Sequence, residues 1–307
     1  MRQHQARFRC ADAARERDDP IAGSAPQTRR WLLLEHLGPW SIDAVAGSGI
    51  EPAILERLSV TAQQTATRIL LVRRHGRKSG GLDRRWILAG LDAATVQGTW
   101  RSDTDLASAA VALMTEPAPA TAEPQPIILV CTHGVHDTCC ALRGRPVAAA
   151  LSAQWPEFVW ECSHVGGDRF APNVLVLPDG FYYGNFAPDE AVVTVQHHLT
   201  GTVAHEYLRG VVRYPPPVQA AVVAAYEHCP PLGPSQITVR SVNQIGPHDG
   251  HGSETIVDLE VPSLGADFRA EMLSVRRAEA KLTCRAARET PATEYRLQRF
   301  EQTSSDR

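Results

Sequence analysis

Residues 127–162 read IILVCTHGVHDTCCALRGRPVAAALSAQWPEFVWEC, and this stretch decides the fold. It begins with the apolar run 127–130, which is typical of a strand buried on both faces. The segment 146–155 has large apolar residues four apart, and this spacing predicts a helix. Residues 158–161 are expected to form the next strand. The stretch therefore predicts a strand–helix–strand unit whose two strands are parallel.

The chain beyond this stretch supplies the rest of an α/β unit. Residues 174–177 form another apolar run, and the turn at 178–180 leads into the aromatic residues 181–183. We expect the two segments to pair as a hairpin. Residues 188–200 are expected to form a helix. The order strand, helix, strand, hairpin, helix predicts a thioredoxin-like plan for residues 127–213.

The segments on either side are expected to form smaller parts of an α/β protein. Residues 1–116 predict an N-terminal α/β segment that starts with a partly helical or loose arm at 1–28. Residues 117–126 hold four prolines, which cannot continue a helix and favour an exposed linker. Residues 214–307 predict a small C-terminal α+β segment.

Apolar patterns within these flanking segments predict individual elements. In the N-terminal segment we expect strands at 31–34, 68–72 and 85–89 and helices at 51–65 and 105–114. In the C-terminal segment we expect a helix near 218–228, strands at 236–245, 254–261, 267–275 and 281–287, and a frayed tail after 298.

The charge balance argues against nucleic acid as a partner. The chain has 307 residues with Lys+Arg 31 against Asp+Glu 34, a net charge of -3, whereas nucleic-acid-binding proteins usually carry a basic excess. The N-terminus lacks the apolar run of a signal peptide, and no stretch approaches the ~18 apolar residues of a membrane helix. We therefore expect a cytoplasmic protein with no membrane partner; its oligomeric state is left open.

The cysteines point to a site rather than to a disulfide framework. The chain has 7 of them, and an odd number cannot be fully paired within one chain. In the cytosol, cysteines are more often thiols, metal ligands or redox groups than disulfides. Four of the seven fall between Cys131 and Cys162. The other three, Cys10, Cys229 and Cys284, are expected to stand alone.

Two loops bring candidate ligands together at one edge of the predicted sheet. Because the loops at the carboxyl ends of neighbouring parallel strands lie close together, we expect the loops after residues 131 and 161 to converge. Together they offer Cys131, Cys139, Cys140, Cys162, His133, His136, His164 and Asp168. Thiolates and imidazoles favour iron or zinc over magnesium or calcium.

The spacing of these residues favours an iron–sulfur cluster over a zinc knuckle. Short C-x-x-C pairs are absent. A [2Fe–2S] cluster needs two ligands for each iron, and histidines can replace thiolates on one of them. Gly166 and Gly167 lie between two candidate ligands, where they allow a positive backbone φ or a close approach of the chain to a cluster.

The motifs of this region resemble a known family. C-T-H-G-x-x-D-x-C-C at 131–140, C-S-H-V-G-G-D-R-F-A at 162–171 and F-Y-Y-G at 181–184 resemble the sucrase/ferredoxin-like family, which is grouped with thioredoxin-like [2Fe–2S] ferredoxins. The resemblance is strongest over 127–200. It implies a thioredoxin-like ferredoxin domain, a bound [2Fe–2S] cluster and one-electron transfer to an unknown redox partner protein. Sucrase activity finds no support, because no carboxylate pair set up for glycoside hydrolysis is recognisable.

The resemblance also implies a ligand set. In the family pattern the first cysteine of the loop and the one nine positions later hold one iron, and these are Cys131 and Cys140 here. Some members hold the other iron with two histidines of an H-x-G-G-H motif, and this chain has His164 at the first position but Asp168 at the second. We expect Asp168 to be the fourth ligand by position. The alternatives are Cys162, which is chemically the better donor for iron, Cys139 and His133.

Arginines near these ligands are expected to act on the site without ligating. Arg169 and Arg143 carry positive charge that can tune the charge of a cluster or dock a reductase. Cys139 is expected to pack rather than to ligate, because adjacent side chains point in different directions.

Two other classes of function stay open at this point. The first is a thioredoxin-like thiol redox enzyme that uses Cys131 with Cys139 or Cys140, although the C-x-x-C motif is missing. The second is a zinc-binding or degenerate scaffold protein. An electron carrier is preferred to an enzyme with its own substrate.

Overall fold

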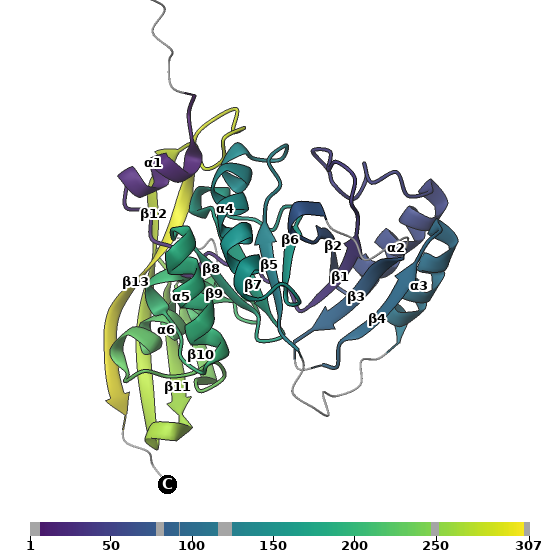
Figure 1. Ribbon diagram of the computed structural model, residues 1–307. Coiled ribbons are helices and arrows are strands. Elements are labelled where there is room, and N and C mark those ends of the chain that lie inside the picture. The colour runs from purple at the N-terminus through teal and green to yellow at the C-terminus, as the bar shows by residue number, and fades with distance from the viewer. Residues whose placement is uncertain (1–6, 78–82, 92, 116–124, 247–251, 304–307) are drawn as a thin grey trace, which may run out of the picture.

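The structure is a computed structural model that describes residues 7–77, 83–91, 93–115, 125–246 and 252–303. Helices and strands alternate along most of these residues, and the strands form two separate sheets (Figure 1). This arrangement confirms the expected α/β class.

The central unit has the strand order of a thioredoxin-like fold. It consists of β5 (Ile127–Cys131), α4 (Thr138–Gln154), β6 (Val159–Cys162), β7 (Asn173–Leu177), β8 (Phe181–Gly184) and α5 (Pro188–Leu199). Strands β5 and β6 are parallel, β7 is antiparallel to β5, and β8 pairs with β7 as the expected hairpin. The neighbour order β6-β5-β7-β8 confirms the thioredoxin-like plan.

The N-terminal part repeats this topology. It consists of β1 (Arg30–Glu35), α2 (Pro52–Gln64), β2 (Thr67–Arg73), β3 (Arg84–Gly90), β4 (Val96–Trp100) and α3 (Ala107–Met114). Strands β1 and β2 are parallel, β3 is antiparallel to β1, and β4 pairs with β3. The order β2-β1-β3-β4 therefore equals that of the central unit. Strand β4 is an element that the sequence patterns did not predict.

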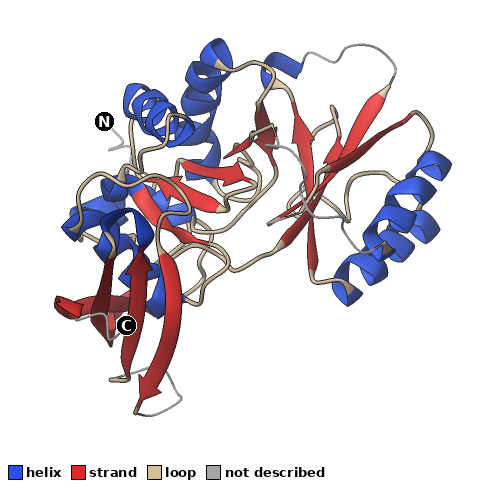
Figure 2. Ribbon diagram, turned by 90° about the horizontal axis from the view of Figure 1, so that it is seen from below, coloured by secondary structure: helices blue, strands red, loops and turns tan. Residues whose placement is uncertain are grey.

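The two units share one nine-stranded sheet. Its edge strand on the side of the central unit is the short strand β9 (Leu208–Val211), which pairs with β8. They join where β2 pairs antiparallel with β6 through Val72 with Cys162 and Arg73 with Glu161. One apolar cluster contains buried residues from both units. Helices α2 and α3 lie beyond the N-terminal strands, away from the central unit (Figures 1 and 2). The two units thus pack through the faces that their helices leave free.

The C-terminal part is an antiparallel sheet against a helix. Helix α6 (Pro216–His228) is followed by β10 (Thr238–Ile245), β11 (Glu254–Val261), β12 (Ala266–Ala280) and β13 (Thr290–Thr303), which pair in chain order. Buried residues of α6 and β11 share an apolar cluster with α4 and α5. The C-terminal sheet is therefore packed onto the helical face of the central unit.

Two expectations for the C-terminal part are wrong. Residues 281–287 form no strand, because this segment bends away from the sheet and the backbone N–H of Cys284 donates to Asp137 instead of to a neighbouring strand. The tail after residue 298 is not frayed as far as Thr303, because β13 pairs with the long strand β12 up to that residue. Both errors arise from contacts between distant segments.

The structure describes most of the N-terminal arm 1–28 but little of the expected linker 117–126. The arm contains the expected helix, α1 (Cys10–Glu16), which lies beside α4 and the strands β12 and β13 (Figure 1). The expected linker 117–126 lies almost entirely outside the described residues, so the domain boundaries stay a prediction. None of the described helices is long and apolar enough to cross a membrane.

Candidate metal centre

The start of helix α4 positions the first half of the site. We expected the helix to begin at residue 146, but α4 already begins at Thr138. There the carboxylate of Asp137 accepts the backbone N–H of Cys139 at 2.8 Å. Pro146 lies inside the helix. The expectation was wrong because glycine and proline usually indicate a loop. Here Gly144 is needed for close packing, since a Cβ atom there would lie 2.0 Å from the carbonyl oxygen of Cys131.

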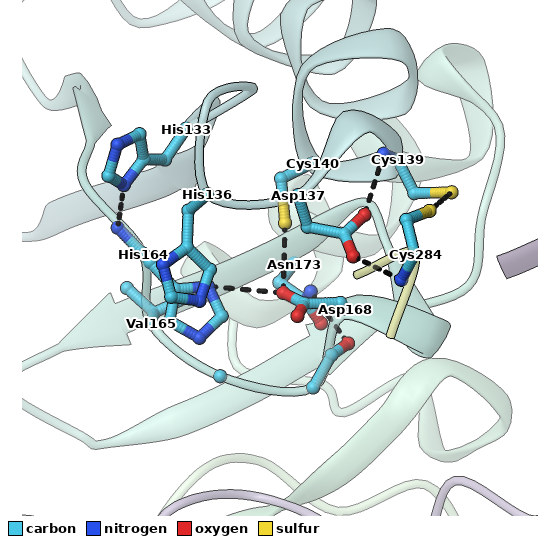
Figure 3. Close-up of polar contacts among 12 residues, drawn as sticks. His133, His136, Asp137, Cys139, Cys140, His164, Val165, Asp168, Asn173 and Cys284 are labelled. Carbon is cyan, nitrogen blue, oxygen red and sulfur yellow. Dashed lines mark hydrogen bonds and ion pairs between the residues drawn. The ribbon is translucent and has the colours of Figure 1, made fainter. Parts of the chain in front are cut away.

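The two loops converge as expected. A sulfur atom each of Cys131 and Cys140 and a ring nitrogen of His164 all lie within 4.8 Å of one another. An overlapping group joins His164 to His136 and Asp168 within the same limit. Figure 3 shows Cys140, His164 and Asp168 pointing toward one another from α4 and from the loop after β6. The structure therefore brings together four of the residues that the sequence singled out as ligands.

Asp168 lies between the two halves of the site. Its Oδ1 atom is 3.2 Å from Sγ of Cys140 and 3.1 Å from Nδ1 of His164, and the residue is buried. Its short contacts are thus with the thiol and the imidazole and not with the adjacent Arg169.

His133 and His136 play different parts. His133 has both ring nitrogens engaged, because Nδ1 accepts the backbone N–H of His164 at 3.2 Å and Nε2 lies 2.7 Å from the carbonyl oxygen of Ser41. Burial lowers its pKa, which fits a neutral ring that links two loops. His136 stacks on His164 with 3.7 Å between ring centroids. His136 is one of the candidate ligands offered by the two loops but not one of the four expected ligands, and its ring belongs to the donor group with His164 and Asp168.

Cys162 and Cys139 lie outside this group. Cys162 is fully buried and is the register partner of Cys131, but its sulfur does not belong to a convergent group of donors among the described residues. Cys139 points away from Cys140, as expected of adjacent residues, and faces Cys10 and Cys284 (Figure 3). The expectation that Cys10 and Cys284 stand alone is therefore wrong.

The electrostatics of the group favour a thiolate at Cys131. A hydrogen bond from Cys140, together with the imidazole of His164, holds the pKa of Cys131 below its usual range despite burial. The same hydrogen bond and burial raise the pKa of Cys140. Burial lowers the pKa of His164, but the contacts with Asp168 and Cys131 outweigh burial and raise this pKa to about 9. Burial raises the pKa of Asp168, and the contact with His164 outweighs it, so the net shift is downward.

Arg209, which no sequence pattern indicated, holds the loop between His164 and Asp168. This fully buried residue on β9 donates from Nη1 to the carbonyl oxygen of Gly166 at 3.1 Å and to Oδ1 of Asn173 at 2.6 Å. Gly167 has a φ of 80°, and a Cβ atom there would lie 2.2 Å from Nη2 of Arg209. Glycine is therefore required by the backbone and by the guanidinium. No local sequence signal could have paired residues so far apart.

The two arginines expected to act on the site pair with the N-terminal arm. Nε of Arg169 lies 3.6 Å from Asp19, and Arg143 contacts the carboxylate of Asp12. Their charges are thus partly balanced by acidic residues of the arm, which is held beside the site by these contacts.

Comparisons with known proteins place the chain among its relatives. Two solved structures from Aquifex aeolicus are similar to a part of the chain. A thioredoxin-like [2Fe–2S] ferredoxin is 20% identical over 29% of this chain and 94% of that chain, with a TM-score of 0.26. A cysteine-to-serine variant of that ferredoxin is 21% identical over 27% of this chain and 97% of that chain, with a TM-score of 0.24. No curated protein matches the chain. The sucrase/ferredoxin-like family model matches residues 21–210, more than half of the chain, so the protein belongs to the sucrase/ferredoxin-like family.

Proposed function

We propose that this protein binds a [2Fe–2S] cluster between the β5–α4 loop and the loop after β6, and that it transfers single electrons to a redox partner protein. The observation that carries the proposal is the convergence of donor atoms from Cys131, Cys140 and His164. The donor set fits the group, because thiolates bind iron in such clusters and imidazoles can replace two of them. Membership of the sucrase/ferredoxin-like family supports the same assignment.

The burial of the donors suggests which iron each would hold. The side chains of Cys131 and Cys140 lie in the core and would hold the inner iron. The side chain of His164 is 22% exposed, so it would hold the outer iron on the solvent side. Asp168 touches both Cys140 and His164, and we assign it as the fourth ligand. His136 is the nearest competitor for that place.

The residues of this chain would set the properties of the centre. When bound, a [2Fe–2S] cluster supplies a one-electron redox couple. The apolar surroundings of Cys131 and Cys140 exclude water from the inner side. His133 and Arg209 fix the loop that carries His164 and Asp168, which keeps the donor geometry constant. The partly exposed ring of His164 gives a partner protein the shortest approach to the centre.

A thiol redox enzyme is the second candidate, because Cys131 and Cys140 are hydrogen-bonded and the pKa of Cys131 is lowered. Both sulfurs are buried, however, at 1% and 0% residue exposure. Thiol–disulfide exchange requires in-line access of a substrate sulfur to the attacking thiolate. The structure offers no such access at these two residues, so cluster binding is the better proposal.

The test is the composition and the visible absorption of protein purified without oxygen. We expect about two irons and two acid-labile sulfides per chain for the wild type, as a [2Fe–2S] cluster requires. Cys140→Ser and His164→Ala are expected to lose the visible absorption, whereas Cys229→Ser, which removes a thiol far from the site, retains it. A colourless, iron-free protein whose Cys131–Cys140 disulfide cycles with a reductant would establish the second candidate instead.

The fourth ligand is tested by three variants of the same protein. If Asp168 ligates, Asp168→Ala changes the spectrum while His136→Ala and Cys162→Ser leave its band positions in place. A spectrum that survives Asp168→Ala but is altered by His136→Ala or by Cys162→Ser moves the assignment to that residue.

A further inference from the structure

Three cysteines from distant segments meet at the start of helix α4, on the side that faces away from Cys131 and Cys140. Cys10 begins α1, Cys139 lies in the first turn of α4, and Cys284 lies between β12 and β13. The sulfur of Cys284 is 3.4 Å from that of Cys139 and 3.5 Å from that of Cys10. Figure 3 shows the sulfurs of Cys139 and Cys284 side by side near Asp137.

Asp137 completes this cluster. Both of its carboxylate oxygens lie 3.7 Å from Sγ of Cys10. Oδ1 accepts the backbone N–H of Cys139 at 2.8 Å, and Oδ2 accepts that of Cys284 at 2.6 Å. One ligand atom from each of the four residues lies within 4.8 Å of the others. A carboxylate has about four lone-pair sites, so the two backbone hydrogen bonds leave it able to bind a metal.

We propose that Cys10, Cys139, Cys284 and Asp137 bind one zinc ion, at a site separate from the centre that contains Cys131 and Cys140. This zinc site does not depend on the proposed function, because its ligands are a different set of residues. The zinc ion would have a structural role, since the protein fills all four coordination positions and leaves none for a substrate.

The distances favour a single ion. Tetrahedral zinc with Zn–S bonds of about 2.3 Å places two thiolate sulfurs ~3.8 Å apart. The observed separations of 3.4 and 3.5 Å are close to that value. In a cubane cluster each cysteine bonds a different iron, which would place the sulfurs farther apart. A disulfide would join only two of the three sulfurs and leave the third as an unpaired thiol.

Burial and charge also fit a metal. Cys10, Cys139 and Asp137 are each at most 1% exposed, so thiolates at this place require a compensating cation, which a bound metal supplies. Zinc supplies two positive charges against three thiolates and one carboxylate. The guanidinium groups of Arg15 and Arg169 interact electrostatically with Cys139 and with Cys10, and they add positive charge near the cluster while also facing Asp12 and Asp19 of the arm.

For the fold, a zinc ion at this place would link an N-terminal helix and a C-terminal loop to the central unit. Zinc at this place would tie α1 and the segment 281–289 to the first turn of α4. That turn also carries Cys140, which belongs to the neighbouring centre. The two sites would thus share one helix start while binding different metals.

The test is the metal content of the full chain, expressed with zinc and iron in the medium. We expect about one zinc per chain in the wild type. Cys10→Ser and Cys284→Ser should each reduce bound zinc at least about tenfold, because each removes one of three thiolates. Cys229→Ser is the matched control, since Cys229 is a partly buried thiol outside the cluster, and it should keep the wild-type zinc content.

Further measurements separate ligand loss from misfolding. Asp137→Asn keeps an acceptor for the helix cap but removes the charge, and it should weaken zinc binding in a competition with a chromophoric chelator. Cobalt added to zinc-free protein should give the sulfur-to-metal charge-transfer band and visible bands of a tetrahedral thiolate site. Hydrogen exchange of Cys284→Ser should be faster in α1 and 281–289, while the far-UV circular dichroism and iron content stay at wild-type values.

Three results would overturn the proposal. The first is wild-type protein isolated without zinc and unable to take up cobalt with a charge-transfer band. The second is zinc content that is equal in the wild type, Cys10→Ser and Cys284→Ser. The third is a disulfide between Cys139 and Cys284 in metal-free protein that binds no added zinc after reduction.

Discussion

Two adjacent residues of this chain face two different groups of potential metal ligands. Cys139 and Cys140 lie in the first turn of α4, where successive side chains are about 100° apart around the helix axis. Cys140 therefore faces Cys131 and Asp168, while Cys139 faces the sulfur of Cys284. The two adjacent cysteines therefore contribute their sulfurs to different groups and do not duplicate each other.

The residue at position 168 sets the charge of the proposed cluster. Asp168→His introduces the second histidine of the H-x-G-G-H pattern and replaces an anionic ligand by a neutral one. We expect this variant to keep its cluster and to raise the reduction potential by on the order of 100 mV, because neutral imidazole ligands favour the reduced state. Protein-film voltammetry of wild type and variant measures the change. A potential that falls or stays constant would show that Asp168 does not bind the iron.

The conformation of Gly167 predicts a local loss of stability. Gly167→Ala places a methyl group against the buried guanidinium of Arg209 at a φ of 80°. We expect the free energy of unfolding to fall by about 2 kcal/mol or more, because backbone strain adds to the clash. Gly201→Ala is the control, since Gly201 has a φ of 87° but no atom within 4 Å of a Cβ, and should cost about 1 kcal/mol. Urea unfolding measures both, and equal losses would contradict the role given to Arg209.

At the scale of elements, the N-terminal and central units join at a seam, the short pairing of β2 with β6, and this seam depends on a buried ion pair. Strands β2 and β6 share only two register pairs, and there Nε of Arg73 donates to Glu161 at 2.9 Å. Glu161 also accepts from the hydroxyl of Thr132 at 3.1 Å and lies 2.9 Å from Nδ1 of His75. Side chains thus provide much of the polar pairing where the ladder is short.

Removing the carboxylate from this seam leaves Arg73 buried without its partner. We expect Glu161→Ala to lower the free energy of unfolding by about 3 kcal/mol, because an uncompensated buried charge is costly. The double variant Arg73→Met with Glu161→Leu should lose less than Glu161→Ala alone. The exposed Glu157→Ala is the control and should change stability by less than about 0.5 kcal/mol. If Glu161→Ala matched that control in urea unfolding, the seam would not depend on the pair.

The elements differ in how far their sequences predict them. The apolar run that forms β5 and the hairpin of β7 and β8 were predicted, because buried strands and tight turns have local patterns. The start of α4 was missed because Gly144 and Pro146 suggest a loop, and β4 was missed because its sequence VQGTW has little apolar pattern. The convergence of Cys131, Cys140 and His164 followed from topology, whereas the meeting of Cys10 with Cys284 depends on long-range packing.

At the scale of the whole molecule, the chain contains two units of the same topology with different chemistry. The last residue of β5 is Cys131, and the last residue of β1 is Glu35. Glu35 is buried and accepts the backbone N–H of Arg85 at 2.9 Å, so it is engaged in its own sheet. The sequence between Cys10 and Cys131 contains no cysteine. Only the central unit therefore carries the thiols that the proposed cluster needs.

The shared cores predict cooperative unfolding of the whole chain. One apolar cluster joins the N-terminal and central units, and another joins the central unit to the C-terminal sheet. A third apolar cluster lies within the N-terminal unit alone, but the two shared clusters couple that unit to the rest of the chain. We therefore expect a single transition in differential scanning calorimetry of the metal-loaded protein. Two transitions separated in temperature would show that the units are stable independently.

The central claim is a two-iron cluster with unlike ligands on its two irons. Mössbauer spectroscopy of protein enriched in ⁵⁷Fe and purified without oxygen tests it most directly, because each iron site gives its own quadrupole doublet. We expect two doublets of equal area, one from the iron held by Cys131 and Cys140 and one from the iron held by His164 and Asp168. A single doublet, as four equivalent thiolates would give, or protein without iron would contradict the claim.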